Sequence, residues 1–284
     1  MPRWNTSNAE VAGYLTEAAC YWTKRLSLDG WRLDVADEIP HSFWKHFKRE
    51  LQKIKPDILL IGEIWSHATG WLLGDEWDSM TNYKYRGAML ALANGNIDCE
   101  QFWCRINGNL RLYKTPQWPY LVNLLGSHDT PRLRHEVKDR RRASLALFCT
   151  LCFEGMPLVY YGDEAGMEGG DDPDNRRAMQ WQSLRVIDKI EVLGALRRDS
   201  DALRKGKTVS IKAGDLLCFE RRYRDEIIRV TANFTDDGQS VRRCGDLLFS
   251  RDAEADDNGF VLRTGGLILE RKKPGYPSLP RNIA

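Results

Sequence analysis

Along most of the chain, segments whose apolar residues recur at helical spacing alternate with short, continuous apolar runs. An apolar stripe from Val11 to Leu26 follows a Ser7–Glu10 capping box, and Pro56 ends a second stripe. Continuous apolar runs are typical of strands covered on both faces. A first helix is therefore expected to begin within residues 5–8 and to end at residue 26. Further helices are expected at 41–54, 87–94, 99–112, 141–153 and 187–203. Strands are expected at 30–35, 58–61, 79–81, 120–125 and 157–161. This alternation predicts a parallel α/β sheet.

The pattern changes after Gly206. Short strand-like runs are separated by Gly/Asp turns at 236–238 and 257–259, which is typical of antiparallel hairpins. Strands are expected at 208–211, 216–222, 227–233 and 261–270. We therefore predict an α/β region at 1–205, a small antiparallel β-sandwich domain at 206–272, and a flexible, proline-containing tail at 273–284.

The expected strand at 30–35 carries two charges. On an extended strand Arg32 and Asp34 point to one face, and the apolar side chains of Trp31, Leu33 and Val35 point to the other. Burying an unpaired charge costs several kcal/mol or more, so these charges need a partner or a use. An Arg–Asp pair that only braces the core and a functional site both fit this strand alone.

Polar clusters follow each clear strand of the predicted sheet. They are Asp34, Glu63, His128-Asp129 and Asp163-Glu164. Ligand chemistry in parallel α/β folds occurs at the carboxyl ends of the strands. Four clusters at equivalent places favour one functional polar site over a structural ion pair.

The composition argues against a nucleic-acid-binding or membrane-bound protein. The formal net charge of +2 over 284 residues gives no support for a nucleic-acid groove or an acidic membrane surface as partner. No apolar run approaches the roughly 20 residues of a membrane span, and the N-terminus resembles no signal peptide. Seven cysteines at irregular spacing favour a reducing compartment, and hence the cytoplasm. Cys149 and Cys152 form a CxxC inside an apolar run, where packing is the favoured interpretation.

Three carboxylates at strand ends fit either a hydrolase or a divalent-metal site. A Mg²⁺ or Ca²⁺ site would draw acids from one loop, and the 171–174 segment resembles such a loop more than the strand ends do. Glycoside hydrolysis needs two carboxyl groups, about 5–5.5 Å apart in retaining enzymes, which neighbouring strands can provide. Arg32 beside Asp34 favours an ionised nucleophile. The apolar strand before Glu63 favours a carboxyl group that holds a proton.

Three blocks resemble ordered sequence blocks of the alpha-amylase family of glycoside hydrolases: GWRLDVA at 30–36, GEIW at 62–65 and SHD at 127–129. Three more are similar to its neopullulanase, cyclomaltodextrinase and maltogenic amylase branch: MPRWN at 1–5, YYGDE at 160–164 and DPDNR at 172–176. Two positions depart from the branch. Gly126 replaces a usual acid or Asn, and Asn175 replaces a usual Cys.

The resemblance implies a retaining hydrolase of alpha-glucans such as cyclomaltodextrins, maltooligosaccharides and pullulan. It implies that Asp34 is the nucleophile, Glu63 the general acid/base and Asp129 the transition-state stabiliser. The implied substrate-binding residues are Arg32, His128, Asp172 and Arg176, with Trp65, Asp37 and Glu38 on the acceptor side. For Trp65, Asp37 and Glu38, ordinary loop residues are an equal alternative. No cofactor is implied, and calcium is not indicated.

The implied fold is a partial (β/α)8 TIM barrel, comprising about five C-terminal β/α units, followed by the β-sandwich domain. The family's first block and early strands are not in this sequence, so the chain is expected to be N-terminally truncated. A catalytically inactive or partner-dependent fragment is the alternative function. Exposed barrel edges are the expected surface for its association.

Overall fold

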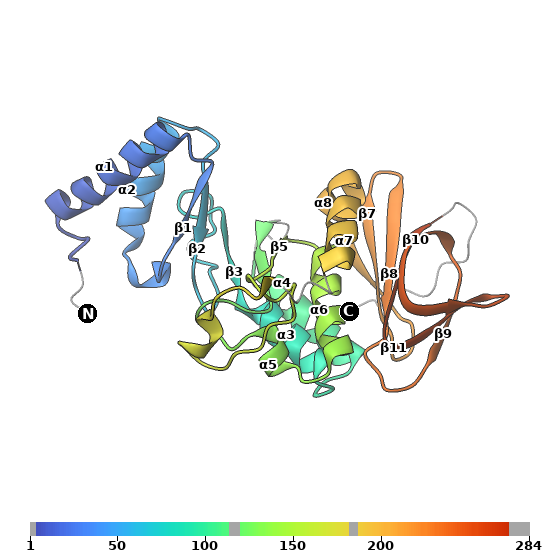
Figure 1. The fold of residues 1–284 in the computed structure, drawn as a ribbon. Helices are drawn as coiled ribbons and strands as arrows, with labels where there is room; N and C mark the ends of the chain where they lie inside the picture. Colours follow the sequence, from blue (N-terminus) through green and yellow to red (C-terminus); the bar gives the residue numbers. More distant parts are fainter. Residues whose placement is uncertain (1–3, 114–119, 182–186, 273–284) are drawn as a thin grey trace. The chain divides into compact units, whose positions relative to one another are not determined.

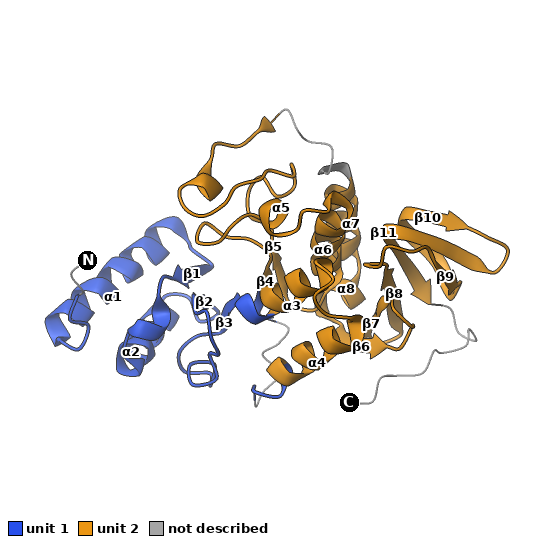
Figure 2. Ribbon diagram, turned by 90° about the horizontal axis from the view of Figure 1, so that it is seen from below, with its two compact units in different colours: residues 1–84, 110–122 blue, residues 85–109, 123–284 orange. Residues whose placement is uncertain are grey.

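A computed structural model describes residues 4–113, 120–181 and 187–272. Contacts divide the chain into two compact units, coloured blue and orange in Figure 2. Unit 1 comprises Met1–Lys84 and Leu110–Val122, and unit 2 comprises Tyr85–Asn109 and Asn123–Ala284. The predicted tail at 273–284 and the first three residues of the MPRWN block lie outside the described residues.

Unit 1 contains the charged strand. Its elements are α1 (Ala9–Leu26), β1 (Gly30–Leu33), the 3₁₀ helix η1 (Ala36–Glu38), α2 (His41–Gln52), β2 (Leu59–Gly62) and β3 (Ser79–Asn82) (Figure 1). β1 pairs with β2 in parallel, with Gly30 opposite Leu59, and β2 pairs with β3 in parallel, with Ile61 opposite Ser79. These pairings confirm the predicted parallel strands.

Local sequence explains both helices of unit 1. Asn8, rather than Ser7, caps α1, because its side chain accepts hydrogen bonds from the backbone N–H groups of Glu10 and Val11. The apolar stripe of α2 is buried, including Phe43, Trp44, Phe47 and Leu51.

Unit 2 continues the alternation of helices and strands. Its elements include α3 (Tyr83–Ala93) and α4 (Cys99–Leu110), β4 (Val122–Leu124), α5 (Leu133–Glu136), α6 (Arg140–Cys152), β5 (Met156–Leu158), η3 (Asp174–Arg176), α7 (Ile187–Asp199) and α8 (Asp201–Lys205). Within unit 1 the strand order β1-β2-β3 follows the chain. The expected helix at 187–203 is wrong as a single element: Ser200 interrupts it and caps α8 through a hydrogen bond from Leu203 N.

The C-terminal strands form one antiparallel sheet. They are β6 (Lys207–Ile211), β7 (Leu217–Tyr223), β8 (Glu226–Ala232), β9 (Gln239–Arg242), β10 (Gly245–Ala255) and β11 (Gly259–Lys272). The order is β10-β11-β8-β7-β6, and β9 pairs with the beginning of β11 while β8 pairs with its end. Gly265 has a φ of +80° between these two pairings, and β10 is irregular opposite it. The sheet can therefore curl into two layers (Figure 1).

The last helix ends at Lys205 and the antiparallel strands begin at Lys207. The contacts between residues nevertheless place these helices and the antiparallel sheet in the same compact unit, unit 2. The division at 205 therefore stays a prediction. Helix α6 explains the grouping, because it contacts β8 and β11. Cys149 and Cys152 are buried on α6 as free thiols, as the packing interpretation expects. Among the described residues, no helix is long and apolar enough to span a membrane.

Candidate active site

One guanidinium contacts both carboxylates at the ends of β1 and β2. Arg32 Nη1 contacts Asp34 Oδ1, and Arg32 Nη2 lies 2.8 Å from Glu63 Oε1. The parallel register explains this meeting, because the ladder continues past both strands: Glu63 N donates to Leu33 O at 2.8 Å. The sequence predicted an Arg32–Asp34 contact, and the structure adds Glu63 to it.

The strand is shorter than predicted, and Asp34 is not on a buried face. β1 ends at Leu33, and Val35 takes a left-handed conformation with a φ of 43°, which is uncommon for a β-branched residue. The Asp34 side chain is 72% exposed as a result. A carboxylate in this position is accessible to a substrate.

Glu63 has a different environment. Its side chain is only 5% exposed, and its second oxygen accepts a hydrogen bond from Val35 N at 3.1 Å. The apolar strand before Glu63 thus does not make up its whole surroundings, because the neighbouring strand end supplies a cation and a backbone donor.

The residues predicted for the acceptor side occupy loops after β1 and β2. Asp37 and Glu38 are exposed on η1. Trp65 is 52% exposed, and its ring stacks on Tyr83 with centroids 4.2 Å apart and planes 8° apart. Trp65 is therefore held by one ring face while much of its surface remains accessible, as a sugar-binding platform requires.

In unit 2 the structure brings together the other four predicted residues. His128 Nε2 lies 3.1 Å from Asp129 Oδ2, and Arg176 Nη2 lies 3.3 Å from Asp129 Oδ1. Arg176 Nε also lies 3.1 Å from Asp172 Oδ1. The turn is closed by hydrogen bonds from Ser127 N to Thr130 Oγ1 and from Asp129 N to Ser127 Oγ. These half-exposed charges form a polar surface that can bind hydroxyl groups.

Arg132, in the segment that follows this turn, is fully buried. Its guanidinium carbon lies 4.6 Å from the ring centroids of both Tyr160 and Tyr161, and its Nη1 donates to Tyr161 O. The sequence missed this cluster; the adjacent tyrosines of the YYGDE block were its only signal. Arg177 instead makes an exposed ion pair with Asp174.

Asp163 is a buried acid, not a member of the exposed cluster. Burial raises the pKa of Asp163 to about 7, although the Arg132 guanidinium 4.0 Å away lowers it. The sequence correctly placed this acid after a strand but could not show that it faces the interior.

Asp163 should make stability depend on pH. Because its folded pKa exceeds the ordinary value of 3.8, the folded state holds this proton more tightly than the unfolded state. The free energy of unfolding should fall as pH rises from about 4 to about 7, by at most about 1.4 kcal/mol per unit, and level off above. Thermal unfolding of Asp163→Asn and wild type should show a difference that grows over this range. A constant difference would contradict the prediction.

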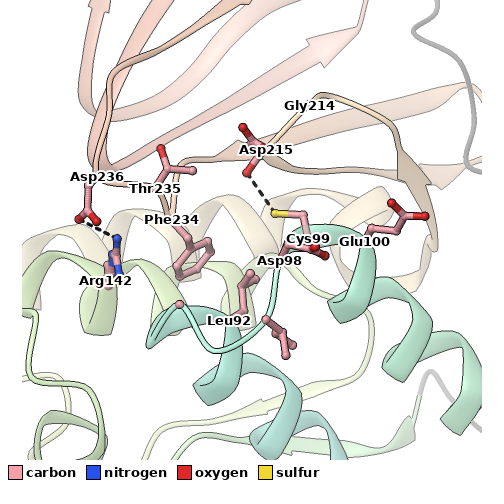
Figure 3. A pocket seen from close by; sticks show the side chains of 12 residues that line it. Leu92, Asp98, Cys99, Glu100, Arg142, Gly214, Asp215, Phe234, Thr235 and Asp236 are labelled. Atoms are coloured by element: carbon pink, nitrogen blue, oxygen red, sulfur yellow. Dashed lines mark hydrogen bonds and ion pairs between the residues drawn. The ribbon is translucent and has the colours of Figure 1, made fainter.

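A pocket of about 340 Å³ elsewhere in unit 2 contains none of the predicted site residues (Figure 3). Its polar groups are largely paired: Cys99 Sγ donates to Asp215 O at 3.2 Å, and Arg142 Nη2 lies 2.8 Å from Asp236 Oδ1. Burial raises the pKa of the Cys99 thiol to about 12, so it is not a reactive thiolate. Among the described residues, no group of three or more His, Cys, Asp or Glu side chains could hold a metal ion.

The chain is similar in sequence to known amylolytic enzymes. The alpha amylase catalytic domain matches residues 1–189. A cyclomaltodextrinase of Geobacillus thermopakistaniensis is 41% identical over 221 residues, which cover 76% of this chain and 38% of that protein. Neopullulanase 2 of Thermoactinomyces vulgaris is 38% identical over 254 residues, covering 85% and 43%. The chain thus spans about two fifths of these curated relatives.

Solved structures agree with the fold. A debranching enzyme from Nostoc punctiforme matches with a TM-score of 0.87 and 28% identity, covering 96% of this chain and 63% of that one. A cyclic alpha-maltosyl-(1-->6)-maltose hydrolase from Arthrobacter globiformis matches with a TM-score of 0.82 and 30% identity, covering 95% and 61%. The predicted fold, part of a TIM barrel followed by a C-terminal β domain, is confirmed.

Proposed function

The chain belongs to the alpha-amylase family of glycoside hydrolases, and from this premise we propose that it hydrolyses alpha-glucans with retention of configuration. The observation that carries the proposal is the contact of Arg32 with both Asp34 and Glu63. Two carboxylates on one guanidinium lie near each other, and retaining enzymes need a separation of about 5–5.5 Å. The exposure of Asp34 and the burial of Glu63 also suit two different roles.

Asp34 is the proposed nucleophile. Its side chain contacts Arg32 and is largely exposed, so a carboxylate oxygen can reach a sugar carbon. Glu63 is the proposed general acid/base. Because Glu63 Oε1 contacts Arg32 and Oε2 accepts a hydrogen bond from Val35 N, bound substrate must displace one of these contacts before a carboxyl oxygen of Glu63 can reach the leaving oxygen.

The polar surface of unit 2 is proposed to bind sugar hydroxyls. Asp129 is the proposed transition-state stabiliser and His128 a ligand of the sugar that is cleaved. Arg176 and Asp172 are proposed to contact the next sugar on the non-reducing side. Charge-assisted hydrogen bonds of this kind are shorter and stronger than neutral ones, which suits a group that must orient a flexible glucan.

The substrate class follows from the relatives. Those named cyclomaltodextrinase, neopullulanase and maltogenic alpha-amylase support cyclomaltodextrins, pullulan and maltooligosaccharides as candidates. We propose that no cofactor is needed, because two carboxyl groups suffice for this hydrolysis. We also propose a cytoplasmic location, supported by free cysteines and by a Bacillus subtilis relative named intracellular maltogenic amylase.

A second candidate is a chain that acts only with a partner polypeptide. Helix α1 favours it, since it exposes the large apolar side chains Tyr14, Tyr21, Trp22 and Leu26. β1 is also the terminal strand of its sheet, so its outer edge can pair with another strand.

The product of hydrolysis distinguishes these candidates. We expect purified chain to release reducing sugar from β-cyclodextrin and pullulan, with the α-anomer appearing first in ¹H NMR spectra. The β-anomer first would contradict retention. If folded chain is inactive, a fragment of the cyclomaltodextrinase relative carrying the part that this chain does not match should restore release under the second candidate.

A further inference from the structure

We propose that Asn175 is a positioning residue that holds Arg176 against Asp129. Asn175 is fully buried on η3, between the charged residues Asp174 and Arg176. Its Nδ2 donates to His128 O at 2.8 Å and to Thr130 O at 2.9 Å. Both acceptors are carbonyl oxygens, which fixes the orientation of the carboxamide, since only its NH₂ group can donate.

These two bonds join the loop to the turn that carries the sugar-binding charges. Asp129 lies between the two acceptor residues, so its backbone is held from both sides. Arg176, the residue after Asn175, donates from Nε to His128 O at 3.0 Å and reaches Asp129 with Nη2. The carbonyl of His128 thus accepts from two consecutive residues of the loop, which fixes the register of Arg176 on the turn.

The opposite side of the loop is held by the tyrosine pair. Tyr160 Oη donates to Asn175 O at 3.3 Å, and Tyr161 Oη donates to Arg177 O at 2.8 Å. Buried Arg132 contacts both rings and donates from its backbone N to Gly169 O at 3.0 Å. The segment that carries Arg176 is therefore held between the turn and the tyrosines, and the carboxamide of Asn175 joins it to His128 and Thr130.

Removing the carboxamide of Asn175 should allow Arg176 to shift along the turn that carries Asp129. In Asn175→Ala both donated bonds are lost, and Arg176 should no longer keep its place on Asp129. The consequence for the reaction rests on the proposed function: kcat/KM for maltooligosaccharides should fall about tenfold, because both Arg176 and the turn that carries Asp129 lose a support.

Asn233 of the β domain provides a matched control. It is also fully buried, and its Nδ2 donates to Asp237 O at 2.8 Å and to Leu262 O at 2.9 Å. Asn233→Ala should lower thermal stability at least as much as Asn175→Ala, because Asn233 Oδ1 also accepts hydrogen bonds from Thr235 N and Oγ1. A merely structural role for Asn175 predicts that both variants behave alike in every other measurement.

The deciding readout does not depend on activity. In ¹H-¹⁵N and ¹H-¹³C NMR spectra of the full chain, Asn175→Ala should displace the ring signals of His128 and the Nε–H signal of Arg176, and Asn233→Ala should leave them unchanged. Assignment is practical because the chain has five histidines. Tyr160→Phe, which keeps the carboxamide, should produce a smaller displacement and serves if Asn175→Ala does not fold. Unmoved signals in the folded variants would overturn the inference, whereas an inactive wild type would overturn only the proposed function.

Discussion

Replacing Asp34 by Asn should lower kcat for β-cyclodextrin hydrolysis by about 10⁴-fold or more. An amide neither attacks the sugar carbon nor forms the glycosyl ester, so the covalent step is lost. The fold should be unaffected, because the Asp34 side chain is 72% exposed and its pairing with Arg32 is correspondingly weak in stability terms. Initial rates at saturating substrate, with circular dichroism to verify folding, measure the effect.

Asp29→Asn is the matched control for this variant. Asp29 precedes the same strand at its other end, is 93% exposed and pairs with Lys55 at 2.9 Å. Its substitution removes an equal charge from unit 1 and should leave kcat within about twofold. If Asp34→Asn retains activity within tenfold of wild type, Asp34 is not the nucleophile.

Replacing buried Arg132 by Met should destabilise the protein by about 3–5 kcal/mol. Removing one partner of a buried ion pair leaves the other charge uncompensated, and here the contacts with two tyrosine rings are lost as well. The loss should be greater at pH 8 than at pH 5, because Asp163 is largely protonated at the lower pH and then needs no cation. Urea unfolding at both pH values measures it.

Two further variants test whether the loss of stability in Arg132→Met comes from the Arg132–Asp163 interaction. Arg177→Met removes a 57% exposed guanidinium paired with Asp174 and should cost less than about 1 kcal/mol. Adding Asp163→Asn to Arg132→Met should recover part of the lost stability at pH 8, since no buried charge is then left alone. Equal destabilisation by Arg132→Met at both pH values would exclude the Arg132–Asp163 interaction as the cause.

Local patterns predicted most helices and the strands of the first sheet. The run at 58–61 and the expected strand at 79–81 each lie within one residue of the observed β2 and β3. Two strands of the β domain were missed, β9 and β10. Their sequences mix polar and apolar residues without clear alternation, and they are held by pairing with the bent β11 rather than by their own propensity.

The sequence by itself determined which residues could form the candidate site. Acids that follow apolar runs are expected at the carboxyl edge of a parallel sheet, and the order of the blocks singled out Asp34, Glu63 and Asp129 as candidates. The sequence could predict the parallel pairing of the first strands because strand formation and side-chain alternation depend on nearby residues, whereas the catalytic roles stay a proposal.

Only the tertiary structure decided what each of these side chains contacts. The left-handed Val35 leaves Asp34 exposed, and the register of β1 on β2 places Glu63 beside Arg32. The carboxamide of Asn175 joins a loop and a turn that are more than 40 residues apart in the chain. Such contacts depend on register and burial between distant segments, which local hydrophobic patterns do not encode.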